Sequence, residues 1–154
     1  MTAIIIIIEL PIILFVKKIM TPYIIYMTCF WDALRSSLSL EDYEYSKQTP
    51  ATNHPELIKM LKKKSIRTES VSWQDSTLRS QEMDEHIETI KAYDITKIQN
   101  GHLTSTCDSF LLLICEIFHL NIIHNFSGTL IKYTCQNPRK TLKFKSNRGH
   151  FTKS

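Results

Sequence analysis

The chain has 154 residues, of which 43% are hydrophobic and 22% charged, and its formal net charge at pH 7 is +4. These proportions are those of one ordinary globular domain, and they argue against a disordered chain or two independent cores. The three glycines, Gly101, Gly128 and Gly149, are isolated from one another. Phosphate-binding loops need clustered glycines, so a P-loop or dinucleotide-binding enzyme is excluded.

The four cysteines have no paired spacing, and a chain of this length can build a core without disulfides. They therefore predict a reducing, intracellular compartment, most simply the cytoplasm. No cofactor is expected. Cys107, Cys115, His119 and His124 lie close in sequence, but they lack the tight Cys-x-x-Cys pairs of zinc sites, so core packing is expected and no metal.

Charge is unevenly distributed along the chain. The part up to Glu116 carries 12 basic and 15 acidic residues, whereas no acidic residue follows Glu116. Such a basic segment can bind nucleic acid or an acidic protein, but on strands it is more often a solvated face, so nucleic acid is not the expected partner. The seven basic residues after Glu116 are Lys132, Arg139, Lys140, Lys143, Lys145, Arg148 and Lys153.

Residues 1–22 form an isoleucine-rich N-terminal segment. Residues 2–16 are apolar apart from Glu9, Pro11 interrupts them, and two lysines follow. A membrane-spanning helix needs about 20 apolar residues, and a signal peptide carries its positive charge before the apolar run. The segment is therefore expected to be a strand or a tail, and a membrane contact stays open as an alternative. Residues 23–154 are expected to form the main domain.

The rest of the chain divides into helices followed by strands. A strand at 24–27 leads into a helix from Cys29 to about Leu40, capped by Thr28, and a polar loop is expected at 41–53. Three more helices are expected: one opening at Pro55, one at 80–93 capped by Ser80, and an all-round apolar one at 108–120, which other layers must cover.

The last third changes to strand periodicity. Residues 121–126 and 129–134 predict a hairpin around Ser127-Gly128, and further strands are expected at 140–145 and from 150. The expected fold class is thus α/β, of the α+β kind, with a small antiparallel C-terminal sheet packed against helices.

One cysteine stands where a thiol is readily activated. The start of a helix favours a thiolate, and its N–H groups can stabilise an acyl oxyanion, so Cys29 is a candidate nucleophile. A histidine must then act as the base, and His150, after a glycine-containing turn and at the start of a strand, is the best placed. The alternative is that Cys29 is a small buried residue.

The residues around this pair resemble the ovarian-tumour (OTU) family of cysteine proteases. Cys29-Phe30-Trp31-Asp32-Ala33-Leu34 is similar to the catalytic-cysteine helix of that family. Asn100-Gly101-His102 followed by Phe110-Leu111-Leu112 resembles its glycine-bearing turn and buried helix. The run 118–123 resembles its helix-to-strand passage, and Gly149-His150-Phe151 its closing histidine strand. The resemblance spans residues 23–154.

The resemblance implies a papain-like α/β fold whose central helix begins at the nucleophile. It implies hydrolysis of the bond after a ubiquitin or ubiquitin-like C-terminus, or of a viral polyprotein, with Cys29 as nucleophile and His150 as general base.

Two features depart from the family. No Asp-Gly pair precedes Cys29, and Thr152 stands where the family often has Asp or Asn. The third catalytic residue is therefore open between Asn147 and Thr152, and a degenerate module that binds ubiquitin, or a basic-faced nucleic-acid-binding protein, remains the alternative.

Overall fold

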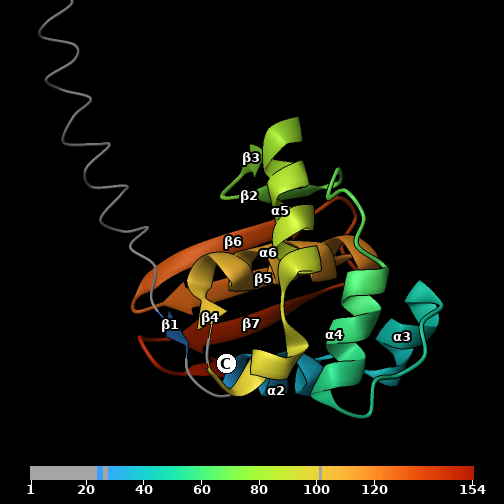
Figure 1. Cartoon of the computed structure of the whole chain (residues 1–154). Coiled ribbons are helices and arrows are strands. Elements are labelled where there is room, and N and C mark those ends of the chain that lie inside the picture. The colour runs from blue at the N-terminus through green and yellow to red at the C-terminus, as the bar shows by residue number, and fades with distance from the viewer. Residues whose placement is uncertain (1–23, 26–27, 101) are drawn as a thin grey trace, which may run out of the picture.

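The computed structural model describes residues 24–25, 28–100 and 102–154, which form a mixed α/β structure (Figure 1). The isoleucine-rich segment 1–22 lies outside the described residues, as do positions 26–27 of the expected first strand. Ile24–Ile25 forms the short strand β1, which pairs antiparallel with β4, His102–Leu103. None of the helices described has the length and apolar character needed to cross a membrane.

The expected first helix is present but shorter than predicted. Helix α2 spans Cys29–Ser37 and is followed by a second helix, α3, Leu40–Ser46, where a polar loop was expected. The loop prediction was wrong because Ser39 and Asp42 form a capping box: the Ser39 hydroxyl accepts from the Asp42 N–H, and the Asp42 carboxylate accepts from the Ser39 N–H. Tyr43 then buries its ring in the core.

The other predicted helices are confirmed. Helix α4, His54–Lys63, is capped by Asn53, and α5, Ser80–Ala92, has Arg79 rather than Ser80 at its N-cap. Helix α6, Thr104–Phe118, is buried all round because it lies between the sheet and the helices α4 and α5 (Figure 1). A short 3₁₀ segment, Ile95–Asn100, connects α5 to β4.

The sheet is larger than expected and is mixed rather than antiparallel. Strands β5 (Leu120–Phe126) and β6 (Thr129–Cys135) form the predicted hairpin, and Gly128 has the positive φ of its turn. Strand β7 (Lys140–Ser146) lies parallel to β5, because β6 is already paired on its other edge by β2. The remaining strands of this sheet are β2 (Val71–Trp73), β3 (Ser76–Thr77) and β8 (Phe151–Lys153). The strand order across the sheet is β3-β2-β6-β5-β7-β8.

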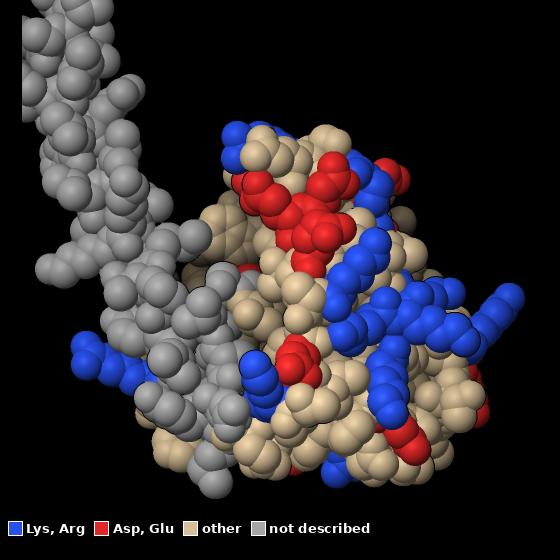
Figure 2. Space-filling view, in the orientation of Figure 1, with Lys and Arg blue, Asp and Glu red and all other residues tan. Residues whose placement is uncertain are grey.

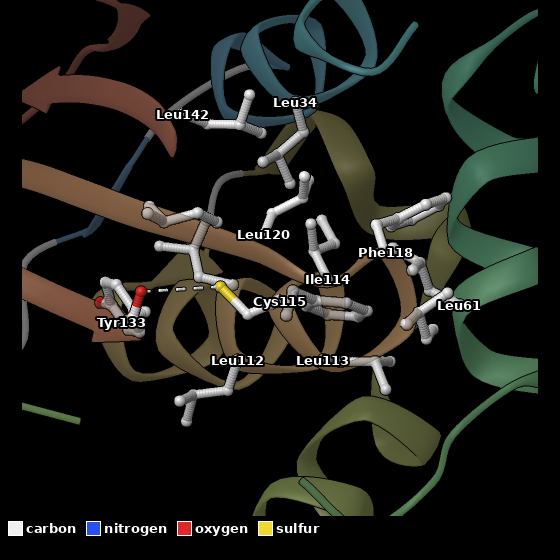
Figure 3. Packing of buried hydrophobic residues seen from close by; sticks show 14 of the residues in the cluster. Leu34, Leu61, Leu112, Leu113, Ile114, Cys115, Phe118, Leu120, Tyr133 and Leu142 are labelled. Carbon is white, nitrogen blue, oxygen red and sulfur yellow. Dashed lines mark hydrogen bonds between the residues drawn. The ribbon is translucent and has the colours of Figure 1, made fainter. Parts of the chain in front are cut away.

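One face of the sheet is covered by helices and carries the core. Helix α6 packs on β2, β5 and β6, and α2 packs on the edge strand β8. Figure 3 shows the side chains of α6 meeting those of the strands, where the Cys115 Sγ lies 4.0 Å from the Tyr133 carbonyl oxygen. The buried apolar residues form one cluster, so the described residues share a single core.

A buried carboxylate joins α3 to the connection between β6 and β7. Arg139 and Lys140 each donate to Asp42 at 2.6 Å, and the Asp42 side chain is only 1% exposed. Burial raises the pKa of Asp42, but the hydrogen bonds from Lys140, Ser39 and Arg139 outweigh it and hold the pKa at about 2. The C-terminal strands are thus tied to a helix that the sequence did not predict.

Candidate active site

Cys29 is the first residue of α2, at the positive end of the helix dipole. Thr28 occupies the N-cap, but its hydroxyl donates to Asp32 at 3.0 Å and makes no capping bond to the helix backbone. Cys29 is also the only one of the four cysteines that is not buried. A nucleophile must be reachable by substrate, so Cys29 is the cysteine best suited to covalent chemistry.

The other three cysteines sit in surroundings that disfavour the thiolate. Burial raises the pKa of Cys107 and of Cys115 well above the usual value, and burial also raises the pKa of Cys135. Nearby charge on Asp108 adds to the effect on the pKa of Cys107. These three thiols are core residues.

His150 directly precedes β8 and is held by a hydrogen-bonded turn. The Asn147 N–H donates to the His150 carbonyl at 3.0 Å, and the Asn147 Oδ1 accepts from the N–H groups of Gly149 and His150 at 3.1 Å each. The His150 side chain is exposed and lines a pocket of about 430 Å³ together with Asn125, Lys145 and Thr152. The ring is therefore accessible, and its backbone position is fixed.

A contact between two buried phenylalanines holds together the two segments that carry the candidate residues. Phe30, next to Cys29, and Phe151, next to His150, pack edge to face with ring centroids 4.9 Å apart. Both rings are essentially inaccessible to solvent. The start of α2 and the start of β8 are consequently held side by side, and in Figure 1 the C-terminus lies beside α2.

Trp31 anchors helix α2 in the core. Its indole N–H donates to the Tyr93 hydroxyl at 3.0 Å, and its ring packs edge to face on Phe110 with centroids 4.7 Å apart. Trp31 is fully buried. The Phe-Trp pair that follows Cys29 in the sequence therefore anchors the start of α2, where Cys29 lies.

The structure separates the two residues considered for the third catalytic position. The Asn147 side-chain oxygen is engaged by two N–H groups of its own turn. Thr152, like Asn147, lines the pocket that His150 lines, and Cys29 is not among the residues that line it. The Thr152 hydroxyl makes only a long bond, 3.4 Å, to the Lys145 carbonyl. Thr152 is thus the better placed of the two.

Two further histidines lie near this region, and the sequence predicted a catalytic role for neither; His124 was expected to pack in the core. His124 of β5 is buried, its ring centroid is 4.9 Å from that of Phe151, and its Nε2 lies 2.6 Å from the Ser146 Oγ. Burial lowers its pKa to about 4, so the ring is neutral at pH 7. The alternation Leu120, Ile122, His124 was the available signal that His124 faces inward.

The second of these is His54, in the first turn of α4. Its Nε2 lies 2.7 Å from an Asp32 carboxylate oxygen on α2, one turn beyond Cys29. The Nδ1 atom of His54 is buried and has no hydrogen-bond partner within the described residues. His54 is accordingly a second histidine close to the helix that begins at Cys29.

A second group of titratable side chains lies at the N-terminal half of α6. Burial raises the pKa of Asp108 to about 6, and the Tyr133 hydroxyl donates to its carboxylate. His86 lies 2.8 Å from the Ser109 hydroxyl, and burial lowers its pKa. Asp108 and His86 line a pocket of about 210 Å³ with Trp73. Within the described residues, no group of three or more His, Cys, Asp or Glu side chains is arranged to hold a metal ion.

No family model, curated protein or solved structure matches the chain.

Proposed function

We propose that the chain is a cysteine protease of OTU type, which hydrolyses peptide or isopeptide bonds after ubiquitin or a ubiquitin-like modifier, or within a viral polyprotein. The observation that carries the proposal is the Phe30–Phe151 contact, because it holds the helix that begins at Cys29 against the strand that follows His150. A papain-like arrangement of this kind requires a cysteine at a helix start and a histidine on a neighbouring strand.

In the proposed reaction, His150 removes the proton from the Cys29 thiol as the sulfur attacks the scissile carbonyl carbon. The oxyanion forms at the N-terminal end of α2, where the helix dipole is positive. His150 then gives its proton to the leaving amine. It next takes a proton from the water that hydrolyses the thioester, which releases the carboxylate product and restores the thiol.

The Thr152 hydroxyl is assigned to orient the His150 ring. It lines the same pocket as His150. A hydroxyl is a weaker partner for imidazolium than a carboxylate, because it brings no charge. The proposed enzyme is therefore slower than one with Asp at this position.

A non-catalytic module is the second candidate, and two observations favour it. No glycine precedes Cys29, and the Thr152 hydroxyl donates to the Lys145 carbonyl. In that case the same surface would bind ubiquitin without cleaving it.

The test is incubation of the full chain with ubiquitin carrying a C-terminal electrophile, followed by peptide mapping. The proposal predicts one covalent adduct, at Cys29, and none in Cys29→Ala. A folded protein that binds ubiquitin but forms no adduct would support the non-catalytic module. A folded protein that neither binds nor reacts would contradict both.

A further inference from the structure

The sheet face that points away from the helices carries exposed lysines. The inward-facing residues of the strands are buried beneath α2 and α6, whereas Lys132, Thr141, Lys143, Lys145 and Thr152 are exposed. The six strands of this sheet contain no Asp or Glu at any position. We call the outward residues of β5, β6, β7 and β8 the basic sheet face; they are Asn121, Ile123, Asn125, Leu130, Lys132, Thr134, Thr141, Lys143, Lys145 and Thr152.

The strand register gathers the lysines into one patch. Ile123 of β5 pairs with Lys132 on one side and with Lys143 on the other. Lys132 and Lys143 are two strands apart, which corresponds to about 10 Å, and Lys143 and Lys145 are two residues apart on one strand, about 7 Å. Lys145 in turn pairs with Thr152. Three lysines therefore lie close together on one face of the sheet, with hydroxyl and amide residues between them.

These lysines are not neutralised within the described part of the chain. The basic residues at the other end of β7 have a partner, because Arg139 and Lys140 are paired with Asp42. Lys132, Lys143 and Lys145 have no carboxylate within 4.0 Å among the described residues. No carboxylate of the described residues therefore offsets their charge.

The helical side of the molecule has a different charge pattern. Figure 2 shows acidic side chains gathered over α5 and basic side chains over α4. The α4 lysines lie among carboxylates: Lys59 acts on Glu56, and the Lys62 ammonium donates to the Tyr93 carbonyl beside Asp94. The basic sheet face has no such acidic neighbours on its strands.

We propose that the basic sheet face binds the sugar-phosphate backbone of nucleic acid, independently of base sequence. The face offers ammonium, hydroxyl and amide groups, which are the side chains that contact phosphate oxygens. It presents no aromatic side chain on which a base could stack. Its lysines and the lack of acidic residues on its strands suit a densely charged partner, since a duplex carries one charge per about 1.7 Å of its axis.

The proposal is tested by fluorescence anisotropy of the full chain with a labelled duplex and a labelled single strand, each in two unrelated sequences. Three phosphate contacts predict a slope of log K against log salt of about −2 for the single strand and about −3 for the duplex. For the duplex, affinity then falls about 40-fold between 50 and 200 mM salt. The two sequences should bind equally.

Two triple variants of equal charge locate the surface. Replacing Lys132, Lys143 and Lys145 by Gln should abolish binding, and each single Lys→Gln change should lower the salt slope by about 1. Replacing Lys59, Lys63 and Lys64 of α4 and its C-cap by Gln should leave most of the binding intact. Equal loss in both triples would assign the effect to net charge and overturn the proposal, as would loss in the α4 triple alone.

The other polyanions give the remaining outcomes. Polyglutamate and phosphatidylserine vesicles are tested at the same salt concentrations. Binding of either of them with no binding of nucleic acid would show an acidic protein or a membrane as the partner and would overturn the proposal. The far-UV circular dichroism of each variant confirms that its fold is unchanged.

Discussion

The two halves of the candidate active site are positioned by different forces. Cys29 begins a helix that two fully buried aromatic residues anchor in the core, Phe30 and Trp31. His150 stands on an exposed turn, where hydrogen bonds to Asn147 fix the backbone. Packing in a core is costly to disturb, whereas a surface turn can shift at little cost. Substitutions of the buried aromatic residues should therefore mainly lower stability, whereas substitutions in the turn that holds His150 should mainly lower activity.

The largest expected effect on stability comes from the ring that joins the two halves. Phe151→Ala removes the contacts with Phe30 and Phe144 and should lower the free energy of unfolding by about 3–5 kcal/mol. Urea denaturation measures the change. The exposed neighbour provides the control, because Thr152→Ala should change stability by no more than about 0.5 kcal/mol. Similar losses in both variants would show that β8 does not rest on α2.

The buried histidine beside this ring should make stability depend on pH. The folded pKa of His124 is about 4, below the usual 6.5, so the unfolded chain binds the proton more readily. This contribution to stability is complete above pH 6.5 and is lost as the pH falls toward 4, amounting to about 3 kcal/mol. We expect His124→Gln to lack this dependence when urea denaturation is repeated across the range. Parallel profiles for the two proteins would contradict the burial of a neutral ring.

Asn147→Ala should affect activity more than stability. It removes the acceptor for two N–H groups of the turn, and stability should fall by about 0.5–1.5 kcal/mol. A displaced His150 should reduce the rate of Cys29 labelling by about 100-fold, because catalytic geometry is sensitive to shifts of about 1 Å. Glu56→Ala is the matched control, since Glu56 accepts similar bonds from the N–H and hydroxyl of Thr52 at the start of α4. The hypothesis fails if both variants label at the same rate.

The smallest expected effect concerns Thr152. Removing its hydroxyl in Thr152→Val should slow labelling by about 2- to 10-fold, the value of one neutral hydrogen bond, while leaving stability unchanged. Thr152→Asp should raise the rate instead, because a carboxylate stabilises imidazolium. An unaltered rate in both variants would remove Thr152 from the proposed site.

Much of the fold followed from sequence because local signals and burial agreed. The apolar character of residues 108–120 indicated a covered helix, and Ser127-Gly128 located a hairpin turn. Helix α3 was missed although its capping box, Ser39 with Asp42, is a local signal. The other errors lay where distant segments meet, as Asp42 meets Arg139 across nearly 100 positions of sequence. The parallel placement of β7 depends on the pairing of β2 with β6, which no local pattern encodes.

The local positions of the two candidate residues also followed from sequence. Cys29 could be placed at a helix start, and His150 at a strand start, from residues close to each. The packing of β8 against α2 could not be derived locally, because it arises from the contact of Phe30 with Phe151. His54 and His124 were missed as neighbours of the site for the same reason.

The most direct test of the account is the rate at which the ubiquitin electrophile labels Cys29 in three proteins: the unaltered chain, His150→Gln and His54→Gln. If His150 is the general base, labelling is lost in His150→Gln and retained in His54→Gln, with both variants folded. Labelling that survives in His150→Gln but disappears in His54→Gln would assign the base to the pair of His54 with Asp32 and would contradict the central claim.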